Sequence, residues 1–119
     1  MSIIPHFEMS SEPRDDATQL IHVKGEIHVS TAPEFAARLD EAIATDASAV
    51  VLDLTEVEFI DSTGLTVLLN GLRSVTLRGG RFAMAISNPT VLRLFEITRL
   101  DATFDIQPTV DDALRRVQA

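Results

Sequence analysis

The sequence is short of several residue types, and each shortage removes a class of protein. It has no cysteine, which excludes disulfides, iron–sulfur clusters and thiolate zinc sites and is compatible with a reducing compartment. It has no tryptophan or tyrosine, so only phenylalanine could stack on nucleic-acid bases. No apolar run approaches the roughly 18 residues of a membrane span, and the first residues lack the pattern of a signal peptide.

Positive charge is also scarce. The chain carries 10 lysines and arginines against 18 aspartates and glutamates, for a formal charge of −8. Nucleic-acid-binding domains present basic patches to phosphates, so this balance argues against a direct nucleic-acid partner. It is compatible with a basic protein partner, although many solvated acidic domains have none.

Motifs for catalysis and metal binding are missing as well. The three histidines do not follow a metal-ligand spacing, and we expect His22 and His28 to be surface residues of strands. There is neither a phosphate-binding loop nor a dinucleotide fingerprint. The run from Asp61 to Gly64 is not a hydrolase nucleophile elbow, because Ile60 stands where that motif needs glycine. We therefore predict no catalytic residue, no metal site and no cofactor.

The sequence does have alternating strand and helix patterns within one domain. Its 119 residues are 45% hydrophobic, which suits a single core, with an edge strand and connection at 1–17 and the core at 18–119. We expect strands at 3–9, 18–23 (continuing at 26–29 after an interruption at Gly25), 49–54, 82–86 and 103–106, and a polar connection at 10–16. Helices are expected at about 32–44 and 62–77, from Pro89, and after Thr109.

This order, ββαβαβαβα, predicts an α/β fold. The sheet should be mixed and mostly parallel, with about four to five strands and four helices, and its first strand should run antiparallel at an edge. Thr31 and Glu34 have the form of a capping box at the first helix. Asp53 interrupts the apolar central strand, so we expect it at an edge or hydrogen-bonded.

The most distinctive polar stretch is Phe59 to Leu65, which follows the central strand and opens a helix with apolar residues at i, i+3, i+4 and i+7. Ser62 therefore falls in the first helical turn, where it is either a cap or a place where chemistry is done. Gly64 either lets another protein's backbone approach or allows tight packing of the helix on the sheet.

Residues 51–65 resemble the core motif of STAS domains, specifically that of bacterial anti-sigma factor antagonists. The resemblance extends through Gly25-Glu26-Ile27, Ala32-Pro33, Gly79-Gly80 and Asn88-Pro89, and covers nearly the whole chain from about residue 20. It implies a cytoplasmic regulatory switch with the STAS fold, either monomeric or weakly dimeric. By this resemblance, the partner is an anti-sigma factor that is also a serine kinase and itself holds the ATP.

The same resemblance assigns roles to residues. It makes Ser62 the phosphorylated serine; the unphosphorylated form binds the anti-sigma factor, which frees the sigma factor, and a serine phosphatase resets the switch. Thr63 is a second, less favoured acceptor of the phosphate. The implied partner-binding residues are Glu26, His28, Ser30, Thr31, Asp61, Ser62, Thr63 and Gly64.

One position departs from the family pattern. Relatives commonly carry Asp or Asn where this chain has His28, which puts partner identity and kinase recognition in question. Two other readings therefore stay open: a STAS module serving as a scaffold, a transporter-associated subunit or a nucleotide-binding unit, and an enzyme of unknown type. Weak nucleotide binding without turnover would favour the former, and robust turnover the latter.

Overall fold

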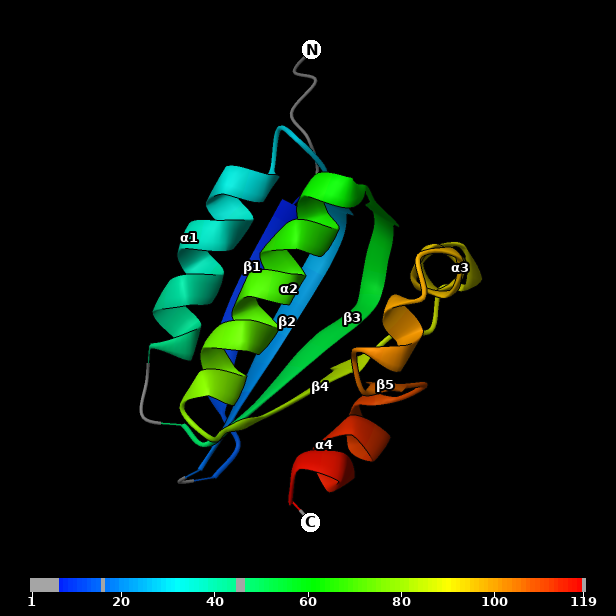
Figure 1. The fold of residues 1–119 in the computed structure, drawn as a ribbon. Coiled ribbons are helices and arrows are strands. Elements are labelled where there is room, and N and C mark those ends of the chain that lie inside the picture. The colour runs from blue at the N-terminus through cyan, green and yellow to red at the C-terminus, as the bar shows by residue number, and fades with distance from the viewer. Residues whose placement is uncertain (1–6, 16, 45–46, 119) are drawn as a thin grey trace.

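The sheet has five strands whose spatial order is the same as their order in the chain (Figure 1). The structure, a computed structural model, describes residues 7–15, 17–44 and 47–118. Strand β1 runs antiparallel to β2, and the pairs β2–β3, β3–β4 and β4–β5 are parallel. The strands are β1 (Phe7–Pro13), β2 (Thr18–Ile27), β3 (Ala49–Ile60), β4 (Arg81–Ala85) and β5 (Ile106–Gln107).

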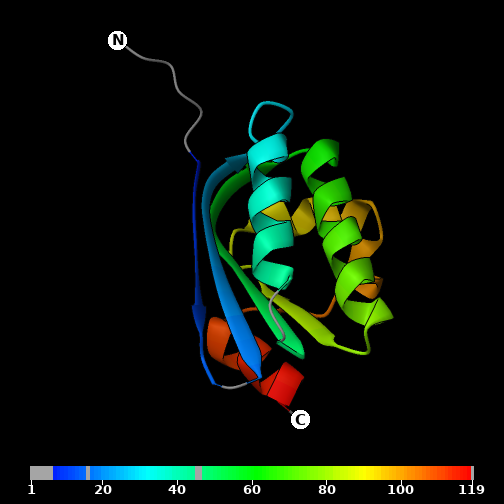
Figure 2. The same cartoon turned by 90° about the vertical axis from the view of Figure 1, so that its left-hand side faces the viewer.

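Helices cover the two faces of this sheet unequally. They are α1 (Ala32–Ile43), α2 (Ser62–Leu77), α3 (Pro89–Ile97) and α4 (Val110–Gln118), with a 3-10 turn, η1, at Leu100–Ala102. Figure 2 shows α1 and α2 side by side on one face, while α4 lies against the other face. The fold class, the strand and helix order and the antiparallel edge strand are therefore as the sequence predicts. Among the described residues, no helix is long and apolar enough to cross a membrane.

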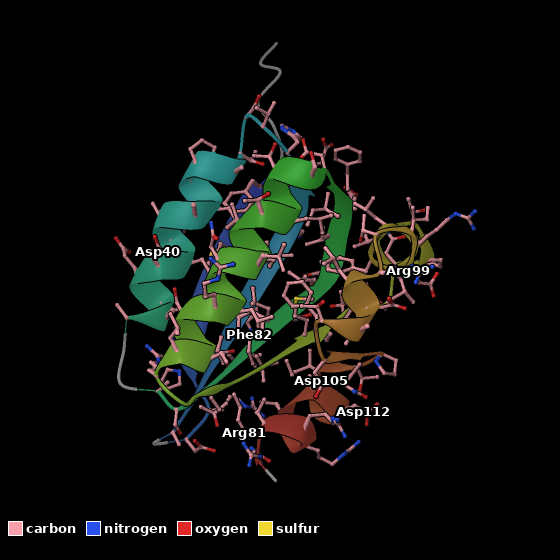
Figure 3. The ribbon with its side chains drawn as sticks, in the orientation of Figure 1. Asp40, Arg81, Phe82, Arg99, Asp105 and Asp112 are labelled. Atoms are coloured by element: carbon pink, nitrogen blue, oxygen red, sulfur yellow. The ribbon has the colours of Figure 1, made fainter. Side chains whose placement is uncertain are left out.

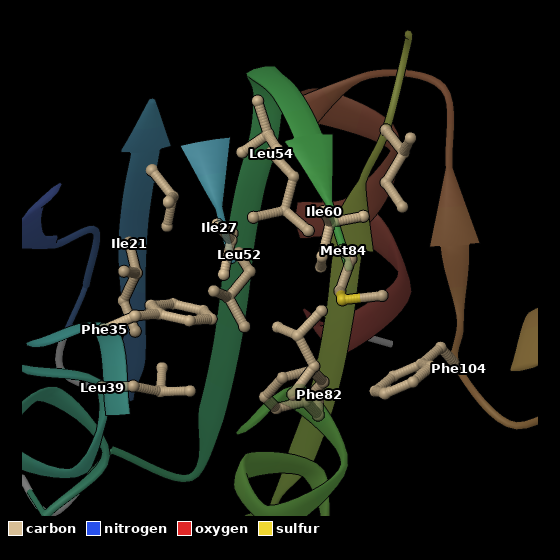
Figure 4. Packing of buried hydrophobic residues seen from close by; sticks show 14 of the residues in the cluster. Ile21, Ile27, Phe35, Leu39, Leu52, Leu54, Ile60, Phe82, Met84 and Phe104 are labelled. Atoms are coloured by element: carbon tan, nitrogen blue, oxygen red, sulfur yellow. The ribbon is translucent and has the colours of Figure 1, made fainter. Parts of the chain in front are cut away.

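Alternation along the central strands divides the core in two. Val50, Leu52 and Leu54 of β3 face α1 and α2 in the larger cluster, part of which Figure 4 shows. Ala49 and Val51 face the other way, into a smaller cluster closed by α4. Because both faces of β3 are covered over this stretch, its sequence is apolar without alternation.

The polar residue in that strand, Asp53, is hydrogen-bonded. One carboxylate oxygen lies 2.8 Å from Nδ1 of His22, and the other accepts from the backbone and hydroxyl of Thr55. His22 lies on the face opposite buried Ile21 and Val23, with its side chain 39% exposed. Both placements agree with the sequence-based expectations.

Strand β3 extends past its expected end at residue 54 to Ile60, and two other segments were also predicted wrongly. Residues 10–13, expected as a connection, belong to β1, whose ladder with β2 runs on to Pro13 opposite Gln19. Their polarity reflects an exposed edge strand; the first part of the expected strand, 1–6, lies outside the described residues. Residues 103–105 of the expected strand are not strand, since the N–H groups of Thr103 and Phe104 bond back to Leu100 and β5 begins at Ile106. Phe104 is buried against Phe82 and Phe95, so its apolar character reflects core packing.

Candidate functional site

The candidate site lies where β3 ends and α2 begins. Asp61 is the N-cap of α2, with an extended backbone (φ −111°). Its Oδ1 accepts the Gly64 N–H at 3.1 Å, and its Oδ2 accepts the Val29 N–H at 3.1 Å. One side chain therefore caps the helix and holds the loop after β2 against it. The helix cap is therefore Asp61, and the interpretation of Ser62 as the cap was wrong.

Ser62 is the first residue of α2, and its side chain is exposed. Its hydroxyl makes no hydrogen bond to any residue that the structure describes. In the same turn, the N–H groups of Gly64 and Leu65 are bonded to Asp61, whereas those of Ser62 and Thr63 have no described acceptor. Free N–H groups at the positive end of a 16-residue helix favour an anion beside this hydroxyl.

The loop after β2 is built around Thr31. This side chain is buried; its Oγ1 donates to the Glu26 carbonyl at 2.8 Å and accepts the His28 N–H at 3.0 Å. Since the hydroxyl is used inside the loop, it makes no cap hydrogen bond to α1, and the predicted capping box was wrong. Glu34 instead lies 3.4 Å from Arg38 on the surface of α1.

His28 is held in one orientation by this loop. Its Nδ1 accepts the Ser30 N–H at 3.1 Å, so the proton of the neutral ring belongs on Nε2, which lies 3.5 Å from the Glu26 carboxylate. The ring centroid is 6.3 Å from that of Phe59, and the side chain is 20% exposed. The prediction that His28 is a surface residue of a strand running to 29 was wrong: β2 ends at Ile27, and His28 is a partly covered loop residue.

Gly64 is buried between the helix and the sheet. A Cβ there would stand 2.7 Å from Ile27 Cγ2 and from Ile60 Cγ1. This is the packing alternative of the two that the sequence left open. Figure 4 shows Ile27 and Ile60 pointing from their strands into the same part of the core.

The structure therefore brings the sequence-predicted residues together as two neighbouring segments. Glu26, His28, Ser30 and Thr31 come from the end of β2 and its loop, and 61–64 come from the start of α2. Ser30 and Ser62 are exposed, Glu26 and Thr63 are partly exposed, and Thr31 and Gly64 are buried. Thr31 and Gly64 support the exposed residues of the site from the interior of the protein.

Two residues of this surface were not among the predicted ones. Val29 is 68% exposed and Phe59 is 46% exposed, although both are apolar. In the sequence, Phe59 begins the stretch that contains Ser62 and Val29 directly follows His28, but a strand pattern assigns such apolar residues to the core. Among the described residues, no group of three or more histidines and carboxylates could hold a metal ion.

Comparison with known proteins identifies the family. The STAS domain model matches residues 10–113. The anti-sigma-B factor antagonist of Listeria monocytogenes is 34% identical over 87 residues, which cover 73% of this chain and 76% of that protein. An anti-sigma factor antagonist from Mycobacterium paratuberculosis has a solved structure with a TM-score of 0.90, 31% identity and full coverage of both chains. The phosphorylated form of the Bacillus cell fate determinant SpoIIAA shares the fold at 22% identity, with a TM-score of 0.69 over 92% of this chain and 99% of that one.

This protein belongs to the STAS domain family. The match covers β2 to β5 and the second part of β1, and it includes the β3–α2 junction where Ser62 lies.

Proposed function

We propose that this protein is an anti-sigma factor antagonist, active when Ser62 is unmodified and switched off when Ser62 is phosphorylated. The observation that carries the proposal is the exposed Ser62 hydroxyl, which has no described partner, at the start of a helix that Asp61 already caps. The names of its relatives support the role, since they are anti-sigma factor antagonists.

The physical argument for a switch is one of charge at a contact surface. A phosphate adds about −1.5 to −2 charge and three acceptor oxygens. The helix N-terminus can hold that group without loss of the fold. A partner packed over this surface would bury an unpaired charge, at a cost of several kcal/mol, which is about 10²-fold or more in affinity.

The proposed contact surface comprises Glu26, His28, Ser30, Thr31 and residues 61–64. Thr31 and Gly64 support it from inside, while the exposed residues touch the partner. Val29 and Phe59 add apolar area on either side of His28, of the kind that anchors interfaces.

The partners follow from the same proposal. An anti-sigma factor with serine-kinase activity brings ATP and transfers its γ-phosphoryl group to Ser62, and a serine phosphatase removes it, all in the cytoplasm. The protein itself supplies no catalysis. It acts as a monomer or weak dimer, and Arg38 covers part of the edge strand by donating to the Met9 carbonyl at 2.6 Å.

The test is mass spectrometry of the intact chain and its fragments after incubation with ATP and each candidate kinase. We expect one phosphate, on Ser62, absent from Ser62→Ala and retained in Thr63→Ala. Binding to the same partner should be retained by Ser62→Ala and weakened about 10²-fold by Ser62→Asp. Equal affinities of these two variants for the partner would contradict the proposed switch.

A second candidate is a STAS module that binds its partner without being switched. His28 favours it, because this residue and its bond to Ser30 replace the acid or amide usual in the family. Binding to a partner kinase with no phosphate transferred to Ser62 would select this function.

A further inference from the structure

The exposed side of α2 carries almost no charge. Its 16 residues include one charged residue, Arg73, and no acid, although 24% of the whole chain is charged. The exposed positions form a stripe along the helix: Ser62, Thr66, Asn70, Arg73, Ser74, Thr76 and Leu77. Charged residues are depleted at the centre of protein interfaces and common on free helix surfaces, so this face has the composition of a contact surface.

The second half of α2 also borders an apolar groove of about 340 Å³. The residues that line it are Leu69, Leu72, Arg73, Thr76 and Leu77 of α2 and Thr103, which follows η1. Leu69 and Leu72 are partly buried, and Leu77 is 81% exposed. With so few polar groups converging on it, this groove is suited to an aliphatic side chain of another protein rather than to a small metabolite.

The charge at the groove indicates what kind of protein fits. Arg73 is exposed and makes no hydrogen bond or ion pair with any described residue. Arg73 is the one charged residue among those that line the groove. A carboxylate beside the groove would meet an unpaired guanidinium, which binds carboxylates in a fork geometry.

We propose that the C-terminal half of α2 is a second docking surface, which takes an acidic amphipathic helix of a partner protein. An apolar side chain of that helix enters the groove between Leu72, Leu77 and Thr103, and neighbouring carboxylates pair with Arg73. A helix laid into a groove by such anchors is a common recognition mode.

This surface lies at the opposite end of α2 from Ser62 (Figure 1). From Ser62 to Arg73 the helix rises about 16 Å at 1.5 Å per residue, which exceeds the Debye length of about 8 Å at physiological salt. Phosphorylation of Ser62 therefore leaves this docking unchanged, so the protein can hold one partner while it releases another.

The test titrates the full-length, ¹⁵N-labelled protein with a synthetic helical peptide about 18 residues long, leucine on one face and glutamate elsewhere, and records amide chemical shifts. The matched probe has lysine at every glutamate position. We expect the acidic peptide to shift the resonances of the groove residues and the basic peptide to bind at least about threefold more weakly. Ser62→Asp should bind the acidic peptide as the wild type does.

Two pairs of variants separate the groove from general effects. Arg73→Glu and Leu77→Ala should each weaken the acidic peptide at least about threefold. Arg93→Glu makes the same charge change on α3, and Ile97→Ala removes the same kind of exposed side chain (67% exposed), both outside the groove lining; neither should alter binding.

The proposal is overturned by equal affinity for both peptides, by no binding at millimolar concentration, or by shifts confined to residues 26–31 and 59–63. Self-association that Leu77→Ala abolishes would assign the groove to a second copy instead. Neither probe requires a kinase, so these outcomes are independent of whether Ser62 is phosphorylated.

Discussion

Asp61 carries two duties with one side chain. Its Oδ1 caps α2 through Gly64, and its Oδ2 holds the loop after β2 through Val29. Its backbone N–H also donates to the Ile27 carbonyl at 3.1 Å, so the residue joins β2, the loop and α2. The Ser62 hydroxyl is left free for a partner or a phosphate because its neighbour meets the local structural need.

Replacement of Asp61 or of Ser62 by alanine tests whether Asp61, and not Ser62, stabilises the start of α2. We expect Asp61→Ala to lower the free energy of unfolding by about 1–2 kcal/mol, through loss of the cap and the loop anchor. Ser62→Ala should stay within about 0.5 kcal/mol of the wild type. Urea unfolding monitored by circular dichroism measures both. A larger loss for Ser62→Ala than for Asp61→Ala would mean that the serine is the cap.

At the scale of single residues, the sequence predicts which residues lie at the candidate site. It predicts less well which atoms each of them hydrogen-bonds. Asp and Ser are both good N-caps, so the sequence alone could not choose between Asp61 and Ser62. Thr31 has the spacing of a capping box, but its hydroxyl is used by the Glu26 carbonyl across the loop. That bond depends on how tightly the chain turns after Ile27, which the local pattern does not encode.

Between elements, the spacing of α2 from the sheet depends on glycine. Gly64→Ala should cost about 1–3 kcal/mol of stability, because the new methyl would overlap Ile27 and Ile60, and the Ile27 carbonyl lies at 3.2 Å. Gly71→Ala in the same helix is the matched control. There the Cβ would meet the Cδ2 of Leu39 at 3.0 Å, the Cδ1 of Ile43 at 3.3 Å and, at an ordinary 3.8 Å, the Cγ of Leu39.

These Gly71 neighbours are side-chain ends that can move, and alanine favours a helix by up to about 1 kcal/mol over glycine. We therefore expect Gly71→Ala to be close to neutral. Thermal unfolding of the two variants compares them directly. If Gly64→Ala were as stable as Gly71→Ala, close packing would not explain the glycine at position 64.

Helix α4 is held to the sheet by a narrow apolar seam. Ala113, Leu114 and Val117 are buried against β3 and β4, with Val110 packed beside them, while four of the other residues of the helix are charged. Leu114→Ala should lower the free energy of unfolding by about 2–3 kcal/mol. Arg115 is exposed and contacts Asp112, which Figure 3 labels on this helix, so Arg115→Ala should change that free energy by less than about 0.5 kcal/mol. Equal losses in chemical denaturation would contradict this division.

Element order and type could be predicted because apolar periodicity survives in every helix. The prediction errors lie where contacts between distant parts of the chain, rather than local sequence, determine the structure. Residues 10–13 are polar because β1 is an edge, and Phe104 is apolar because it packs between Phe82 and Phe95. Strand β3 runs on to Ile60 beyond the expected end at 54, since its final residues pair with Lys24 to Ile27 of β2 after a break in register.

Over the whole molecule, negative charge is in excess and opposes the compact state. The formal charge is −8, and the exposed ion pairs, such as Arg38 with Glu34 and Arg116 with Asp105, contribute little each. Raising NaCl from about 10 mM to about 150 mM should therefore increase the free energy of unfolding by a few tenths of a kcal/mol. A decrease with salt would mean that the attractive pairs outweigh the repulsion. Urea titrations at both salt concentrations measure this change.

The spatial order of the strands also affects how the chain can fold during synthesis. Each strand leaving the ribosome finds its neighbour already made, so the sheet can grow by addition at one side as translation proceeds N-terminal first. The face lined by Leu20, Val51 and Ala83 is covered by α4, which follows all five strands in the chain and is released after them. A nascent chain of this kind exposes an apolar sheet face until α4 has left the ribosome, and during that interval it has the greatest need of a chaperone.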